Sequence, residues 1–253
     1  NWQGHLSGNI EVHPIKHLFT TSSDDGSWRL WALPTSSEPA AALLLSGEGH
    51  SDWLTSCSFS PDGDKLATTS GDSTVRVWDL SRGLCLLSLR GHLRATWVHF
   101  LPSCDHLLLS SGRDHMLLLW DERASTWASE IRGHAHPVEH CTSDTTGRVA
   151  ASCDAGGDVK LWDMRSLRSA LYSAPTSPSG ANQVSLCPAG TGSEEVAVAG
   201  GDGLVRLLRP SSGHVTEVGG HQGAACTVCF DHQGETLLSA GADGIVQVWR
   251  RSQ

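Results

Sequence analysis

Tryptophans that end short β-rich runs recur along the chain at nearly regular distances. They stand at positions 31, 78, 120, 162 and 249, and the steps from 78 to 120 and from 120 to 162 are both 42 residues. Gly-His pairs precede them at 4–5, 49–50, 91–92, 133–134 and 220–221. The step of 87 from 162 to 249 leaves room for one more unit, with Leu208 in the tryptophan position. The chain is therefore six copies of one unit of about 40 residues.

Each unit contains four short strand-like runs separated by turn residues. In the second repeat we expect strands over 54–59, 65–70, 75–78 and 84–89, with Ser60–Gly63 as the turn between the first two. A four-stranded sheet of this size cannot bury both of its faces alone and has to stack on copies of itself. The sequence therefore predicts an all-β fold, a β-propeller with six four-stranded blades.

The repeats follow one another without a linker that could separate domains. They run over about 4–45, 49–90, 91–132, 133–175, 180–219 and 220–253, so we expect one propeller domain over 1–253. The last repeat ends soon after its third strand, at Arg250. Residues 1–3 precede the first Gly-His pair, and we expect them to supply the missing strand and close the ring.

Charge and cysteine content exclude several classes of function. The formal net charge of −9 disfavours binding to nucleic acid or to an anionic membrane surface. The CxxC spacing at 226–229 falls in a strand, where positions i and i+3 face opposite sides, so we expect no metal site. No apolar run could cross a bilayer, and the scattered cysteines favour a reducing cytoplasm. We expect no cofactor and no small-molecule substrate.

Polar residues recur at fixed distances before the tryptophans: an aspartate six residues earlier and a serine or threonine ten residues earlier. With the Gly-His histidines they form four sets, namely His5, Thr21, Asp25 and Trp31; His50, Thr68, Asp72 and Trp78; His92, Ser110, Asp114 and Trp120; and His221, Ser239, Asp243 and Trp249. An indole N–H only donates, a carboxylate only accepts, and hydroxyl and imidazole do both, so a buried chain of hydrogen bonds can satisfy all four. Such sets also contain the residues of a catalytic triad, but nothing supplies an oxyanion hole, and we expect no catalytic residues.

Two repeats depart from this rule. The fourth has Gly156 where the aspartate is expected, and the fifth has Val198 and Leu208 in place of the hydroxyl and the tryptophan. We expect these blades to be fastened less tightly, with Asp154 free to contact a partner. Substituting Asp72 by alanine should then cost about 1–3 kcal/mol, and the same change at Asp154 much less.

The loops after the Gly-His pairs hold the other candidates for partner binding. These are Asp52, Trp53, Arg94, Trp97 and Gln222. An aromatic side chain on a rigid loop is a typical interface anchor. The alternative is that Trp53 and Trp97 begin strands and pack between blades.

The Gly-His and Trp-Asp repeats resemble the WD-repeat family over essentially the whole chain. GHSDW at 49–53, GDKLATTSGDSTV at 63–75, ASCDAG at 151–156 and LVRLL at 204–208 are more specifically similar to the sperm-associated antigen 16 family. The resemblance includes both irregular repeats. It implies a non-enzymatic scaffold of the axonemal central pair in motile cilia and flagella, partnered by other proteins of the microtubule bridge. That family carries seven repeats, whereas here the third repeat joins the start of one to the end of the next.

A second resemblance keeps another function open. The tetrapeptides that end at Arg123 and Arg165 follow the WDxR pattern of WD-repeat substrate receptors for cullin-type ubiquitin ligases. In such a receptor these two arginines would contact the ligase.

Overall fold

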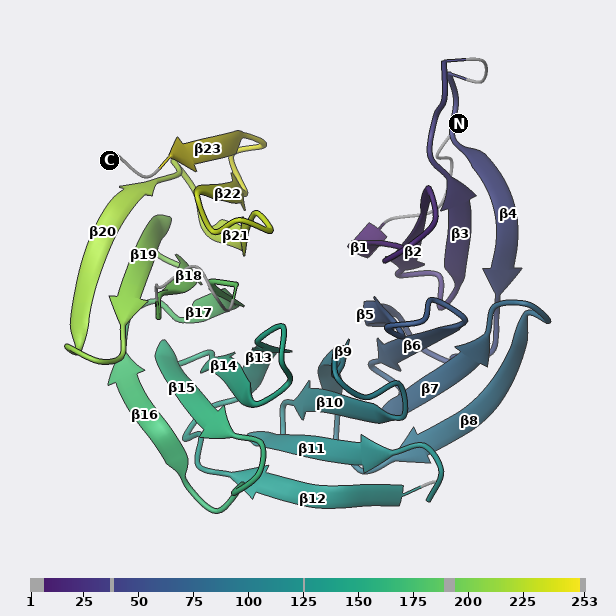
Figure 1. The fold of residues 1–253 in the computed structure, drawn as a ribbon, viewed down its shortest axis with the longest axis horizontal. Coiled ribbons are helices and arrows are strands. Elements are labelled where there is room, and N and C mark those ends of the chain that lie inside the picture. The colour runs from purple at the N-terminus through teal and green to yellow at the C-terminus, as the bar shows by residue number, and fades with distance from the viewer. Residues whose placement is uncertain (1–6, 37–38, 125, 189–193, 251–253) are drawn as a thin grey trace. The chain divides into compact units, whose positions relative to one another are not determined.

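The computed structural model describes residues 7–36, 39–124, 126–188 and 194–250, and their regular secondary structure is entirely β. The chain divides into two compact units, Asn1–Asp114 with Leu118–Glu130, and His115–Leu117 with Ile131–Gln253. Six antiparallel sheets of sequential strands are present in the described part, three mainly in each unit (Figure 1). The predicted all-β fold with six blades is confirmed. No described helix has the length and hydrophobicity of a membrane span.

The first unit holds the first three blades. Their strands are β1 (Ser7–Val12), β2 (Leu18–Ser23), β3 (Trp28–Ala32) and β4 (Ala42–Gly47); β5 (Leu54–Phe59), β6 (Lys65–Ser70), β7 (Thr74–Asp79) and β8 (Leu84–Arg90); and β9 (Ala95–Phe100), β10 (Leu107–Gly112), β11 (Met116–Asp121) and β12 (Thr126–Arg132). The strands predicted for the second repeat agree with β5 to β8 to within a residue at each end. The turn after β5 closes with a hydrogen bond of 2.8 Å from the Gly63 N–H to the Ser60 carbonyl, and Gly63 has φ of +75°, which favours glycine.

The second unit holds the last three blades. Their strands are β13 (Val138–Ser143), β14 (Val149–Asp154), β15 (Asp158–Asp163) and β16 (Ala170–Pro175); β17 (Ala181–Leu186), β18 (Val196–Gly200), β19 (Leu204–Arg209) and β20 (His214–Gly220); and β21 (Ala225–Phe230), β22 (Thr236–Gly241) and β23 (Val246–Arg250). In the described residues the last sheet has three strands. Residues 1–3, expected to complete it, and His5 lie outside the described residues. The closed ring and the single domain stay predictions.

Neighbouring sheets within a unit pack through apolar side chains and are joined by polar contacts at equivalent positions. In the first unit Val77 and Val98 lie in one buried cluster that spans the second and third blades. The Phe100 N–H donates to the Ser58 hydroxyl at 3.2 Å, and in the second unit the Phe230 N–H donates to the Ser185 hydroxyl at 3.2 Å. These bonds satisfy backbone donors that a sheet edge would otherwise leave open.

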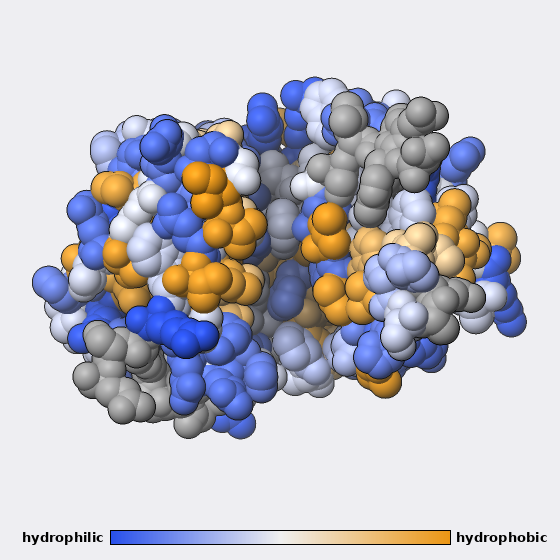
Figure 2. Space-filling model, turned by 90° about the horizontal axis from the view of Figure 1, so that it is seen from above, coloured by the Kyte–Doolittle hydropathy of each residue, from blue (hydrophilic) through white to orange (hydrophobic). Residues whose placement is uncertain are grey.

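Apolar side chains also reach the surface, chiefly on the fourth strands. Leu43, Leu86 and Leu171 are each about half exposed or more. On the face drawn in Figure 2, hydrophobic residues form small groups among hydrophilic ones. Single exposed apolar side chains and small groups of them are ordinary on a protein surface.

Candidate functional site

The second blade brings its four predicted polar residues into one hydrogen-bonded chain. The Trp78 indole N–H donates to Thr68 Oγ1 at 2.8 Å, Thr68 Oγ1 lies 2.8 Å from His50 Nε2, and His50 Nδ1 lies 2.9 Å from Asp72 Oδ2. Because the ionised carboxylate can only accept, His50 carries its proton on Nδ1 and accepts the threonine proton at Nε2. Every member is therefore satisfied.

Ionisation in this network follows from its burial. Burial lowers the pKa of His50, and Asp72 opposes this shift without reversing it. Burial alone would raise the pKa of Asp72, but hydrogen bonds from Thr74, His50 and the Ser51 N–H outweigh it and hold the pKa at about 2. A neutral imidazole beside a carboxylate thus fastens the Gly-His loop to the sheet.

The same arrangement recurs in other blades. Contacts of 2.7–3.2 Å join His92, Asp114, Ser110 and Trp120 in the third blade and His221, Asp243, Ser239 and Trp249 in the sixth. In the first blade the Trp31 indole donates to Thr21 at 3.0 Å, and Asp25 accepts the Ser27 N–H at 2.9 Å. The hydroxyls of Thr68, Ser110 and Ser152 are fully buried, so these sets offer no accessible nucleophile.

The fourth blade corrects the prediction for Asp154, because this side chain is not free. Asp154 Oδ2 lies 2.8 Å from His134 Nδ1, and both side chains are completely buried. Ser152 Oγ accepts the Trp162 indole N–H at 2.8 Å and lies 2.6 Å from His134 Nε2. Asp154 is therefore the carboxylate of a complete network and cannot serve as a partner contact.

The carboxylate reaches the same histidine position from a different place in the chain. Asp154 is the last residue of β14, two positions before the turn residue that supplies the aspartate in the other blades. A Cβ on Gly156 would lie 2.1 Å from His136 Nδ1, so the His136 ring fills the space beside the turn. Asp154 Oδ1 accepts the N–H groups of Gly156 and Asp158, each at 3.0 Å, and so also closes the turn.

The fifth blade replaces the network with an ion pair that the sequence analysis missed. Asp202 accepts two hydrogen bonds from the Arg206 guanidinium, at 2.9 and 2.7 Å, and these bonds lower the pKa of Asp202 although burial opposes them. Leu208, in the tryptophan position, is fully buried. The available signal was an arginine four residues after the turn aspartate, on β19, the strand that follows the turn.

Trp53 and Arg94 come together on the surface of the first unit. The Arg94 guanidinium carbon lies 4.8 Å from the centre of the Trp53 ring, and Trp53 is 40% exposed. The two occupy equivalent loop positions, because the Trp53 carbonyl accepts the Gly71 N–H at 3.0 Å and the Arg94 carbonyl accepts the Arg113 N–H at 2.9 Å. Each loop is thus tied to the next turn of its own blade.

The remaining loop candidates have different surroundings. Asp52 Oδ1 accepts the Trp53 N–H at 2.9 Å, so it holds the same loop. Trp97 is the third residue of β9 and is partly buried, so it belongs to a strand, as the alternative has it, but does not begin one. Gln222 is exposed, and its N–H donates to Asp243 at 2.9 Å.

The two WDxR arginines fold back onto their own Trp-Asp aspartates. Arg123 donates to Asp121 at 2.9 and 2.7 Å, and Arg165 Nε lies 3.4 Å from Asp163. The Arg123 side chain lowers the pKa of Asp121, and the Arg165 backbone N–H, together with its side chain, lowers the pKa of Asp163. Among the described residues no three His, Cys, Asp or Glu side chains are grouped to hold a metal ion.

Comparison with known families assigns the repeats. The model described as WD domain, G-beta repeat (WD40) matches residues 42–79, 83–121, 126–163 and 212–250, together more than half of the chain. The first match runs from β4 through β7, so a sequence repeat combines the fourth strand of one blade with three strands of the next. The segment from β16 to β19 is unmatched, and it contains the blade in which an ion pair replaces the network.

Individual relatives are more distant. The guanine nucleotide-binding protein subunit beta of Zea mays is 26% identical over 98% of this chain and 69% of the relative, and that of Oryza sativa subsp. japonica is 25% identical over the same shares. Telomerase protein component 1 of Mus musculus is 27% identical over 93% of this chain, which spans only 9% of that protein. With the six blades and their networks, the repeat matches identify the family: the chain belongs to the WD40 repeat proteins.

Proposed function

We propose that this chain is a non-enzymatic scaffold that binds other proteins, and that the exposed Trp53–Arg94 pair is one of its contact points. That pair is the observation that carries the proposal. The networks of buried residues account for the recurring Ser, His and Asp residues as structural fasteners, so the chemistry left at the surface is that of recognition.

The pair has the properties of an interface anchor. Trp53 offers a large aromatic face on a loop that backbone hydrogen bonds hold in place, so little conformational entropy is lost on binding. Among the described residues the Arg94 guanidinium has no acidic partner, and its donors remain available while its central carbon lies 4.8 Å from the centre of the Trp53 ring. Tryptophan and arginine are the side chains most enriched in binding hot spots.

The setting we propose is the central pair of the ciliary axoneme, within the bridge that joins its two microtubules. Support comes from the sequence resemblance to the sperm-associated antigen 16 family, which includes both irregular repeats. The net charge of −9 favours contacts with other bridge proteins over contacts with the acidic tails of tubulin.

The test is the recovery of the tagged chain from detergent-extracted cilia. We expect the chain in the axonemal fraction, and a Trp53→Ala, Arg94→Glu double variant to be depleted from it. Leu84→Ala is the matched control, because Leu84 is 59% exposed on β8. A chain that stays in the detergent-soluble cytosol refutes the axonemal setting. Equal retention of the double variant and the control refutes the role of the Trp53–Arg94 pair.

A further inference from the structure

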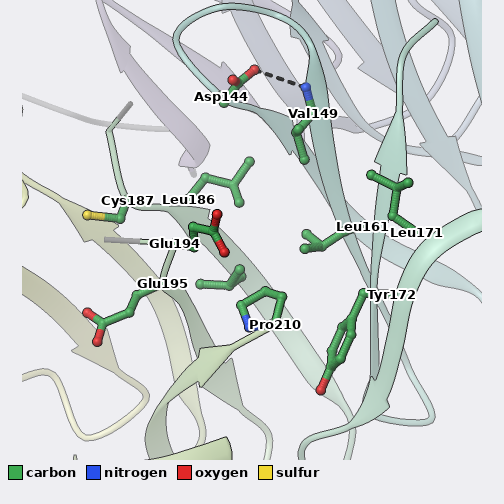
Figure 3. A pocket seen from close by; sticks show the side chains of 11 residues that line it. Asp144, Val149, Leu161, Leu171, Tyr172, Leu186, Cys187, Glu194, Glu195 and Pro210 are labelled. Carbon is green, nitrogen blue, oxygen red and sulfur yellow. Dashed lines mark hydrogen bonds between the residues drawn. The ribbon is translucent and has the colours of Figure 1, made fainter. Parts of the chain in front are cut away.

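A cavity of about 360 Å³ lies in the second unit, between the sheets formed by β13–β16 and β17–β20. Its apolar wall is built by Val149, Leu161, Tyr172, Leu186 and Val196, with Leu171 at its border (Figure 3). We call this feature the acidic groove, because three carboxylates also line it. Its volume is within the range of roughly 300–1,000 Å³ that is usual for binding sites.

The apolar wall is a continuation of the core. Leu161 and Val196 are buried members of the cluster that packs the two sheets together, and Val149, Tyr172 and Leu186 pack against that cluster. Side chains held in this way cannot collapse into the cavity without loss of packing elsewhere. The groove is therefore a preformed apolar recess.

The three carboxylates of the groove differ in whether they already have hydrogen-bonding or charged partners. Glu195 is buried and accepts a hydrogen bond of 2.7 Å from Arg209, which neutralises it. The Asp144 carboxylate is held within its own turn, where it accepts the N–H groups of Arg148 and Val149 at 2.8 and 3.1 Å. Glu194 is exposed and makes no hydrogen bond or ion pair with another described residue.

Figure 3 shows the Glu194 carboxylate turned toward the middle of the pocket, whereas Glu195 and Cys187 point away from it. With the Glu195–Arg209 pair neutral, Glu194 and Asp144 leave the groove with a negative charge beside an apolar wall. The matching ligand is an apolar group that carries a cation close by.

The apolar surface of the groove also extends beyond the cavity. Leu171 is 62% exposed on β16, and β16 is the last strand of its sheet, so apolar surface continues from the cavity onto a sheet edge. A chain segment can cover both parts, whereas a compact molecule fills only the cavity.

We propose that the acidic groove binds a short segment of a partner protein that places an apolar side chain in the cavity and a lysine or arginine against Glu194. The site lies in the second unit, whereas Trp53 and Arg94 lie in the first, and it does not depend on the axonemal setting. The scaffold could then hold two partners, one that brings a basic segment to the acidic groove and one that brings an acidic group to Arg94.

The probe is a short peptide in which leucine and lysine alternate, added to the full chain with labelled leucine and valine methyl groups. We expect saturable shifts of the methyl signals of Val149, Leu161 and Val196. Peptides with glutamate in place of lysine, or serine in place of leucine, should leave these signals unshifted. Signals that move equally with the serine peptide would reveal unspecific charge attraction and overturn the proposal, as would the absence of any shift at these residues.

Two variants test whether the lysine of the bound peptide lies against Glu194. Glu194→Lys should raise the dissociation constant of the leucine–lysine peptide about threefold to tenfold, because it exchanges attraction for repulsion at the rim. Glu235→Lys is the matched control: Glu235 is exposed in the corresponding turn of the next sheet and undergoes the same charge change. Equal effects of the two variants would overturn the assignment of Glu194.

Discussion

Replacing Asp154 by alanine tests the correction that the structure makes to the fourth blade. The substitution leaves three donors without their acceptor: His134 Nδ1–H and the backbone N–H groups of Gly156 and Asp158. A buried donor without a partner costs about 1–3 kcal/mol. Water can reach the turn but not the imidazole, so we expect the free energy of unfolding to fall by about 3–5 kcal/mol.

Urea unfolding followed by tryptophan fluorescence measures this loss. Asp158→Ala is the control, since Asp158 begins β15 directly after the same turn and its side chain is 34% exposed. Among the described residues this side chain makes one ion pair, of 3.8 Å with Lys160, so its loss should change stability by less than about 1 kcal/mol. Asp154→Asn keeps the shape and one acceptor oxygen and should fall between the two. If Asp154→Ala unfolds at the same urea concentration as Asp158→Ala, the network of the fourth blade is refuted.

Two further changes have defined outcomes. Burial raises the pKa of Glu11 to about 7 despite hydrogen bonds from Phe59 and Ser58, so the stability that the neutral Glu11 side chain contributes is complete below pH 4.5 and lost as the pH rises through 7. Glu11→Gln should therefore raise the melting temperature at pH 8.5 and leave it unchanged at pH 4. A gain of equal size at both pH values would contradict this. Arg206→Met should lower the free energy of unfolding, measured in urea, by about 2–4 kcal/mol, because it leaves the Asp202 carboxylate without its charged partner. Adding Asp202→Asn should recover part of that loss, and strict additivity of the two changes would show that the pair is not coupled.

The repeating strands could be predicted closely from the sequence. Turn residues at fixed offsets and the recurring tryptophan locate β5 to β8 to within a residue, since the same local chemistry is repeated with each blade. The hydrogen-bonded sets of the second, third and sixth blades follow from the donors and acceptors of four residue types.

The partners of Asp154 and Arg206 could not be predicted from residue spacing. The rule counts positions along the chain, but the histidine needs only a carboxylate at hydrogen-bonding distance, and the end of β14 supplies one as well as the turn does. In the fifth blade, where histidine and tryptophan are both missing, a guanidinium satisfies the turn aspartate instead.

The acidic groove could not be predicted for a different reason. Its lining comes from five strands and three turns of two blades, and nothing in the sequence around Glu194 or Leu171 distinguishes them from other exposed residues. The pairing of Trp53 with Arg94 likewise depends on the stacking of two blades, although each residue was a candidate alone.

The central claim is that the second, third and fourth blades are each fastened by an indole that donates to a buried hydroxyl. Exchange of the indole N–H protons with deuterium, followed by NMR of the chain with labelled tryptophan, tests it directly. The signals of Trp78, Trp120 and Trp162 should persist long after those of the exposed Trp53 and Trp127 have disappeared. Loss of all five signals at the same rate would contradict the account.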